Sequence, residues 1–275
     1  MQLARRLQSV LARYLNPGGD PRIGQGVLAL QVLSLERWLA AAGDDAPSRP
    51  VSIVTATRDR PALLRRAAAS VVGQRYRDWQ WIVVNDGAPG SCDAVLSPHS
   101  SDPRITLVEA GGVGLAAARN QGLEVATGEF VTYLDDDNRI HYGWLGALAF
   151  AVERAPATVW GYGARIVETP EVVRHEELAG FPYLELPIFD PERLRRHGNY
   201  IDANTLFHRN GEWRFDERTR SQSDWELILQ LTSEADPLRV PAVACLYSTA
   251  HPGRMSRGAN RADDVPVIRA KHGLH

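Results

Sequence analysis

The stretch FVTYLDDDNRI, residues 130–140, joins a mostly apolar run directly to three acids. Its first five residues are typical of a buried strand, and no turn residue separates them from Asp135, Asp136 and Asp137. Adjacent carboxylates repel one another, so the cluster is unfavourable unless a cation lies nearby. A solvated acidic turn is the plain alternative, but the position directly after a buried strand argues against it. The stretch therefore predicts a strand that ends in a charged binding site.

Short apolar runs alternate with helical patterns on both sides of this stretch. We expect strands at residues 51–57, 79–86, 104–110 and 129–135, and helices at residues 61–74 and 114–128. This alternation predicts an α/β domain with a mainly parallel central sheet flanked by helices. In such sheets ligands bind beyond the carboxyl ends of the strands. Polar residues fall at several of these ends, namely Thr57, Arg58, Asp86 and the three acids.

The chain is expected to have three parts. Residues 1–48 form a helical extension, because apolar residues recur there at helical spacing and Gly43 ends the second run. Residues 49–250 form the main domain, and residues 251–275 form a tail that could close over the site as a lid. The N-terminal helices could pack on the main domain, join two copies into a homo-oligomer or lie on a membrane surface.

Composition excludes several classes of function. The 275 residues carry a formal net charge of −2, so no basic excess points to nucleic acid. No window approaches the roughly 18 consecutive apolar residues of a membrane span, and the N-terminus is a poor secretion signal. Cys92 and Cys245 lie far apart and indicate neither a disulfide framework nor a zinc site. We therefore expect a cytoplasmic protein, with peripheral attachment to a membrane left open.

A dinucleotide-binding fold is one interpretation of the central region. Residues 112–117, GVGLAA, fit the G-x-G-x-x-G/A pattern, and Asp135 follows about 20 residues later as a candidate ribose ligand. That would make the chain an NAD-dependent dehydrogenase. However, a full strand-helix-strand unit precedes the motif, whereas the fingerprint normally lies on the first unit. The interpretation also gives Asp136 and Asp137 no role.

A divalent-metal site is the other interpretation of the acids. Carboxylates are ligands that Mg²⁺ and Mn²⁺ prefer, and these metals typically bind one or two carboxylates together with substrate phosphates. Asp135 and Asp137 are two residues apart, so on an extended segment they would project to the same side. The acids would then hold a metal on a phosphate-bearing substrate.

Three segments resemble family 2 glycosyltransferases of the GT-A fold. They are VSIVTATRDRPALLRRAAASVVGQRYRDWQWIVVNDGA at 51–88, GGVGLAAARNQGLEVATGEFVTYLDDD at 111–137 and FDERTRSQSDWELILQL at 215–231. Each segment is only moderately specific, but together they span the region from about residue 51 to about residue 232 in the family's order. The resemblance implies a GT-A fold and sugar transfer from a nucleoside-diphosphate sugar.

The resemblance implies roles for individual residues of the nucleotide site. The expected nucleotide-binding residues are Thr57, Arg58, Asp86, Arg119, Asp135 and Asp136. Thr57 and Arg58 would lie against the base and ribose, with the Arg58 guanidinium where the family commonly has an aromatic ring. Asp86 would accept a hydrogen bond from the base, and Arg119 would lie near the phosphates.

The resemblance also separates the three acids and extends the metal site. Asp137 is the stronger candidate for metal ligation, with Asp135 beside it, and Asp136 is the middle residue expected to tolerate substitution best. His251 would be a third metal ligand. The diphosphate would be bound by one or both of two arginines of the tail, Arg254 and Arg257.

An inverting transfer also needs a carboxylate that takes the proton of the acceptor hydroxyl. The resemblance assigns this role to Asp224, with Glu226 as the alternative. Asp224 lies near a predicted helix start, where aspartate is also common as a cap. Trp225 beside it could offer an apolar face to a sugar ring, although core packing is the commoner use of tryptophan.

The sequence thus predicts a metal-dependent, inverting, hexosyltransferase-like enzyme that uses Mn²⁺ or Mg²⁺. It would move a sugar from a nucleoside-diphosphate sugar, with a UDP-sugar as the expected donor, to an acceptor hydroxyl. The alternative from another class is a nucleotide-sugar-binding protein that keeps the GT-A fold without turnover. Mn²⁺-dependent turnover would distinguish the two.

Overall fold

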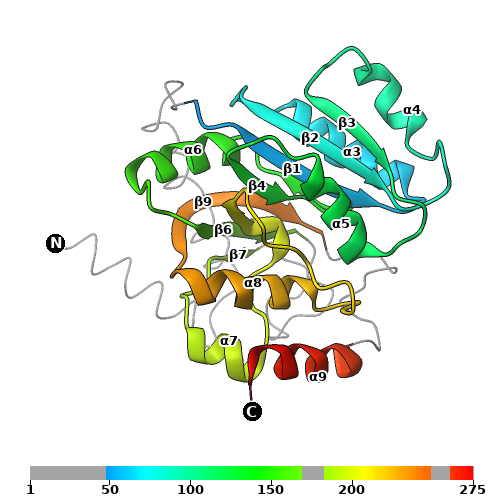
Figure 1. Ribbon diagram of the computed structural model, residues 1–275. Coiled ribbons are helices and arrows are strands. Elements are labelled where there is room, and N and C mark those ends of the chain that lie inside the picture. The colour runs from blue at the N-terminus through cyan, green and yellow to red at the C-terminus, as the bar shows by residue number, and fades with distance from the viewer. Residues whose placement is uncertain (1–47, 169–182, 249–260, 275) are drawn as a thin grey trace, which may run out of the picture.

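The computed structural model describes residues 48–168, 183–248 and 261–274 (Figure 1). The helical extension expected over residues 1–48 lies outside the described residues up to residue 47. The same holds for His251, Arg254 and Arg257 of the expected tail. Within the described part of the chain, no helix is long and apolar enough to cross a membrane.

The first half of the sheet is parallel, as the strand and helix alternation predicts. It contains β1 (Val51–Thr57), β2 (Trp79–Asn85), β3 (Ile105–Glu109) and β4 (Phe130–Tyr133). Strand β1 pairs in parallel with both β2 and β4, and β3 pairs in parallel with β2 at the edge of the sheet. The carboxyl ends of β1, β2 and β4 therefore meet at one edge.

The second half of the sheet is mixed, which local periodicity did not indicate. Its strands are β5 (Arg139–Ile140), β6 (Trp160–Val167), β7 (Tyr183–Glu185), β8 (Leu206–Arg209) and β9 (Leu238–Tyr247). Strand β8 runs antiparallel to β4 and joins the halves. Strand β6 pairs antiparallel with β7 and β8 but parallel with β9, and β5 is antiparallel to β9.

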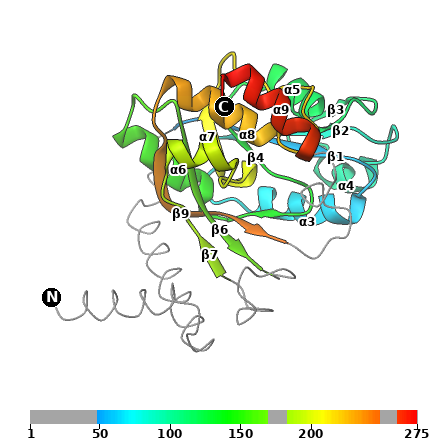
Figure 2. The ribbon, with the colours of Figure 1, turned by 90° about the horizontal axis from the view of Figure 1, so that it is seen from below.

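Helices cover both faces of the sheet. They are α3 (Pro61–Val72), α4 (Asp93–Leu96), α5 (Leu115–Glu124), α6 (Trp144–Arg154), α7 (Pro191–His197), α8 (Ser223–Glu234) and α9 (Arg261–His272), with 3₁₀ turns η1 (Ser97–His99) and η3 (Ala203–Thr205). Figure 2 shows α3 on one side of the sheet and α5 and α9 on the other.

Successive residues of β1 face the two hydrophobic cores. Ile53 belongs to the core shared with α3 and α6, whereas Val54 belongs to the core shared with α5, α7, α8 and α9. Helix α5 comes close to β1 because residue 122 is a glycine, and a Cβ there would lie 2.6 Å from Val54 Cγ1. This approach brings the N-terminal half of α5, with Arg119, towards the carboxyl ends of the strands.

Candidate functional site

A cleft of about 400 Å³ lies at the carboxyl ends of β1, β2 and β4. It brings together most of the predicted site residues, namely Thr57, Arg58, Asp86, Arg119, Asp135, Asp137 and Asp224. Helix α5 contributes Arg119, helix α8 contributes Asp224, and the others lie at or just after the ends of β1, β2 and β4. Asp136 and Glu226 do not line it.

The three acids lie in a turn rather than on an extended segment, so the expected conformation was wrong. Strand β4 ends at Tyr133, and the amide of Asn138 donates a hydrogen bond of 3.0 Å to the carbonyl of Asp135. Asp135 and Asp137 nevertheless both line the cleft. The turn directs the middle acid, Asp136, into the protein, where it has no exposed surface.

Asp136 links the acid turn to the loop after β1. Its Oδ2 accepts hydrogen bonds from Thr57 Oγ1 at 2.6 Å and Arg60 Nε at 3.0 Å, and Arg60 Nη2 forms an ion pair with Oδ1 at 2.5 Å. Burial raises the pKa of Asp136 to about 6, although Arg60 and Thr57 oppose the shift. The assignment of Asp136 to the nucleotide is therefore corrected, because its oxygens contact protein groups and not the cleft. A buried, paired carboxylate is also a poor choice for the acid most tolerant of substitution.

Asp135 is held on both carboxylate oxygens. Arg119 Nη2 lies 2.6 Å from Oδ1, and the side-chain amide of Asn204 donates a 2.9 Å bond to Oδ2. Burial opposes ionisation of Asp135, but Arg119 and Asn204 outweigh it and hold its pKa below the usual range. A third of the Asp135 side chain remains exposed to the cleft. Asp135 is therefore an ionised, fixed carboxylate at the cleft wall.

Asp86 binds the glycine-rich loop that precedes α5. Its carboxylate accepts hydrogen bonds from the amides of Val113 at 2.6 Å and Gly114 at 3.1 Å. Gly114 has φ of 93°, a conformation that favours glycine. These amides are the ones that a dinucleotide fold would offer to a pyrophosphate, so the geometry does not support the dehydrogenase interpretation.

The loop after β1 directs three consecutive charged side chains to three different places. Arg58 is exposed and lines the cleft, whereas Asp59 accepts a 2.8 Å bond from the amide of Ala88 on the loop after β2. Arg60 pairs with Asp136 and lies 3.9 Å from Asp137 Oδ2. Arg60 was missed in the sequence, because nothing local shows that it faces the acid turn.

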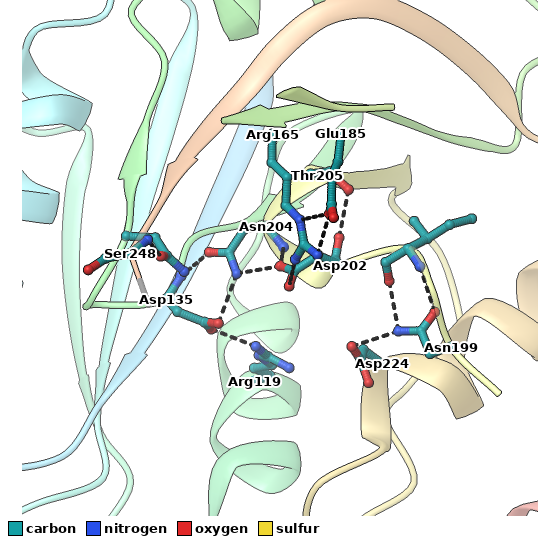
Figure 3. A network of polar contacts seen from close by, with 12 residues as sticks. Arg119, Asp135, Arg165, Glu185, Asn199, Asp202, Asn204, Thr205, Asp224 and Ser248 are labelled. Carbon is teal, nitrogen blue, oxygen red and sulfur yellow. Dashed lines mark hydrogen bonds and ion pairs between the residues drawn. The ribbon is translucent and has the colours of Figure 1, made fainter. Parts of the chain in front are cut away.

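Asp224 lies in the first turn of α8, facing the cleft (Figure 3). The N-cap residue is Gln222, so Asp224 does not occupy the capping position. Asn199 Nδ2 donates a 2.8 Å bond to its carboxylate. Burial raises the pKa of Asp224 to about 6, and the nearby charge of Asp202 adds to this, while Arg119 opposes it. A carboxylate with a raised pKa in a cleft is suited to accept a proton near neutral pH.

Glu226 is not available as a base, and that alternative is corrected. It is fully buried on α8 and contacts α9, where Lys271 Nζ lies 2.8 Å and His272 Nε2 2.9 Å from its Oε1. Trp225 is also no sugar platform, because it is 1% exposed and its indole donates a hydrogen bond to the carbonyl of Leu194. The first turn of α8 thus carries a cleft-facing acid directly before two core residues.

Besides Arg60, four polar residues that support the site were missed in the sequence. Asn199, Asp202 and Asn204 lie between α7 and β8, and their clustering within six residues was the only available signal. Asp264 of α9 is 2% exposed and accepts hydrogen bonds from the amides of residues 220–222, just before α8. No local pattern indicates this contact, because the partners are about 40 residues apart.

The carboxylates that line the cleft fit a hard divalent cation that takes some of its ligands from the protein and the others from a substrate. The described residues contain no group of three His, Cys, Asp or Glu side chains placed to hold a metal alone. Asp137 and Asp135 both reach the cleft, with the Asp137 side chain 11% exposed. Mg²⁺ and Mn²⁺ typically bind one or two carboxylates plus substrate phosphates, which is the donor set available here.

A family model for Glycosyl transferase family 2 matches residues 52–215, more than half of the chain. The chain belongs to glycosyl transferase family 2. This family-2 glycosyltransferase is similar to the uncharacterised glycosyltransferase YwdF of Bacillus subtilis (strain 168). The two are 26% identical over 235 residues, which cover 82% of this chain and 84% of YwdF. The matched range contains the cleft residues up to Asp202 and Ala203, and Asp224 lies beyond it.

Solved structures show that this glycosyltransferase has the GT-A fold. It is similar to S. aureus TarS 1–349 in complex with UDP-GlcNAc, with a TM-score of 0.64 and 14% identity over 82% of this chain and 66% of that chain. It is also similar to the mannosyltransferase PcManGT from Pyrobaculum calidifontis in complex with GDP-Man and Mn²⁺. There the TM-score is 0.51, with 20% identity over 98% of this chain and 81% of that chain.

Proposed function

We propose that this protein is a metal-dependent, inverting glycosyltransferase that moves a hexose from a nucleoside-diphosphate sugar to an acceptor hydroxyl. One observation carries the proposal: a single cleft is lined by Asp137, by Asp135 with its lowered pKa, and by an Asp224 carboxylate whose pKa is raised to about 6. The complexes of TarS with UDP-GlcNAc and of PcManGT with GDP-Man and Mn²⁺ support a nucleotide sugar and a divalent metal. A UDP-sugar is the expected donor.

The parallel half of the sheet would bind the donor. Arg58 is exposed at the cleft and could cover the base and ribose, while Asp86 and the loop it holds would form the opposite wall. Arg119 forms an ion pair with Asp135, and its guanidinium would place a positive charge near the phosphates. A divalent cation held by Asp137, with Asp135 beside it, would stabilise the departing diphosphate as a Lewis acid.

Asp224 would take the proton of the acceptor hydroxyl as the hydroxyl attacks the sugar. With a pKa of about 6, the carboxylate is mostly ionised at pH 7 and is more basic than an ordinary aspartate. Asn199 fixes one of its oxygens, which limits the orientations of the carboxylate. Attack from the side opposite the diphosphate would invert the anomeric centre.

The test is a panel of UDP- and GDP-sugars incubated with the full chain and Mn²⁺, with nucleotide release as the readout. We expect release from at least one donor, its loss when a chelator replaces Mn²⁺, and a loss of about 100-fold or more in Asp137→Ala. Asp263→Ala changes an exposed acid outside the cleft and is the matched control. If the protein instead binds a donor without turnover, and neither the chelator nor Asp137→Ala changes that binding, the result would support a binding protein.

A further inference from the structure

One short segment contacts acids on both sides of the cleft. Residues 199–205 follow α7 and include the η3 turn. Asn199 at the start of this segment donates to Asp224, and Asn204 near its end donates to Asp135. Figure 3 shows Asn204 beside Asp135, Asn199 beside Asp224, and Asp202 next to Asn204. The segment therefore links the proposed donor side to the proposed base through hydrogen bonds.

Asn204 uses both ends of its side-chain amide in this connection. It is 3% exposed; its Oδ1 accepts a 2.7 Å bond from the amide of Asp135, and its Nδ2 donates to Asp135 Oδ2 at 2.9 Å and Asp202 Oδ1 at 2.7 Å. Hydrogen bonds to carboxylates are stronger than neutral ones. A neutral group with one acceptor and two donors can bridge two carboxylates, whereas a third carboxylate would repel both.

The rest of the segment is fixed by its own bonds and by β6. Arg165 of β6 lies 2.7 Å from Asp202 Oδ2 and 2.6 Å from Glu185 of β7, so Asp202 is paired on its second oxygen. Asn199 bonds both the amide and the carbonyl of Ile201 while it holds Asp224. With so few free rotations, a shift of Asn204 would be passed to Asn199, because fully satisfied polar networks are rigid.

We propose that Asn204 is a positioning residue that couples Asp135 to Asp224 through segment 199–205, so that nucleotide and metal on the donor side order the base. The coupling rests on the proposed function, since it needs a donor at Asp135. A ligand that fixes Asp135 fixes Asn204, which holds the segment and thereby the Asn199–Asp224 bond. The free energy of this coupling acts in both directions between the two sites.

The test is hydrogen–deuterium exchange of the full chain with and without saturating UDP or GDP and Mn²⁺. In the wild type we expect slower exchange on ligand binding around residues 135–138, in segment 199–205 and at the start of α8. In Asn204→Ala we expect the protection near residues 135–138 to remain and the protection at the start of α8 to be lost. Protection of α8 that persists in Asn204→Ala would overturn the coupling.

Controls separate this failure from other causes. Asn210→Ala removes an asparagine whose side-chain amide donates to the carbonyl of Ala126, far from both acids, and should behave as wild type. Asn204→Asp keeps the size of the side chain but places an oxygen against Asp135 and Asp202, and it should also lose the protection of α8. If the wild type shows no protection by either nucleotide, the proposed function fails, and the coupling fails with it.

The kinetics of single and double variants give a second readout, because independent structural effects would multiply. With the donor saturating, Asn204→Ala and Asn199→Ala should each lower kcat by roughly 10- to 100-fold, because a small misplacement of a catalytic group has that effect. If both substitutions act on Asp224 by one route, the kcat of the double variant should be no lower than the kcat of the less active single variant. Effects that multiply would contradict a shared route.

Discussion

Asp135, Asp136 and Asp137 are consecutive carboxylates in three different environments. Asp135 is ionised between Arg119 and Asn204, Asp136 is buried against Arg60, and Asp137 reaches the cleft. Their sequence shows that a charged site follows β4, and both outer acids do line the cleft. It does not show that the chain turns within the motif, because that depends on the Asn138 amide and on an arginine of another loop.

Substitution of Asp224 should separate activity from stability. Because the pKa of Asp224 rises from 3.8 to about 6 on folding, the ionised carboxylate destabilises the folded state above pH 6, and the effect disappears below pH 4. Asp224→Asn should therefore lower kcat about 100- to 10,000-fold and raise the free energy of unfolding at pH 8 by about 1–3 kcal/mol. Urea denaturation at pH 8 and pH 4 measures the second effect. A variant that is active or is less stable at pH 8 would contradict the role and environment given to Asp224.

The pH dependence of turnover should follow the same carboxylate. The base must be ionised, so kcat should fall as the pH drops below about 6. Burial is the largest cause of the raised pKa of Asp224, and the charge of Asp202 is the next. Asp202→Asn should therefore move the acidic limb of the kcat profile, where kcat falls, to lower pH. Glu192→Gln removes an equal charge from the exposed surface of α7 and should leave the limb in place. An unchanged or higher limb in Asp202→Asn would contradict the electrostatic role of Asp202.

At the scale of elements, α9 fixes the start of α8. Asp264 accepts hydrogen bonds from the amides of Arg220, Ser221 and Gln222, and Lys271 and His272 contact Glu226 one turn further along α8. These amides outweigh burial and hold the pKa of Asp264 below its usual value. The C-terminal helix therefore positions the helix that carries Asp224.

Removal of the Asp264 carboxylate should weaken this arrangement. Asp264→Ala leaves buried amides without an acceptor, so we expect a loss of about 1–3 kcal/mol in the free energy of unfolding. We also expect a fall in kcat of roughly tenfold, because Asp224 is less well positioned. Asp263→Ala, which changes the exposed neighbour, is the control. Stability and kcat equal to those of the control would show that α9 does not hold α8.

The four strands and two long helices up to residue 137 were predicted from the sequence, whereas after it only the start of α8 was. In the first half, buried parallel strands and amphipathic helices follow one another, so each element is visible in its own periodicity. The second half pairs β8 with β4 and β9 with β6 across long stretches of sequence. The contacts of Asn199, Asp202 and Asp264 depend on that pairing and on α9, and this is why the residues that support Asp224 were missed.

At the scale of the whole molecule, the cleft lies where the two halves of the sheet join. The parallel half supplies the residues proposed to bind the donor, and the mixed half with α8 supplies Asp224 and Asp202. Strand β8 and the segment before it connect the halves. This division assigns donor binding and proton transfer to different parts of the chain, so single substitutions should separate them.

The most direct measurement is calorimetric titration of the nucleoside diphosphate, UDP or GDP, into three proteins: wild type, Asp137→Ala and Asp224→Asn. Each titration is done once with Mn²⁺ and once with a chelator. We expect wild type and Asp224→Asn to bind with similar affinity in Mn²⁺ and at least tenfold more weakly with the chelator. Asp137→Ala should bind weakly in both conditions. Binding that is equal in all three proteins and unaffected by the chelator would contradict a metal-nucleotide site at the end of β4.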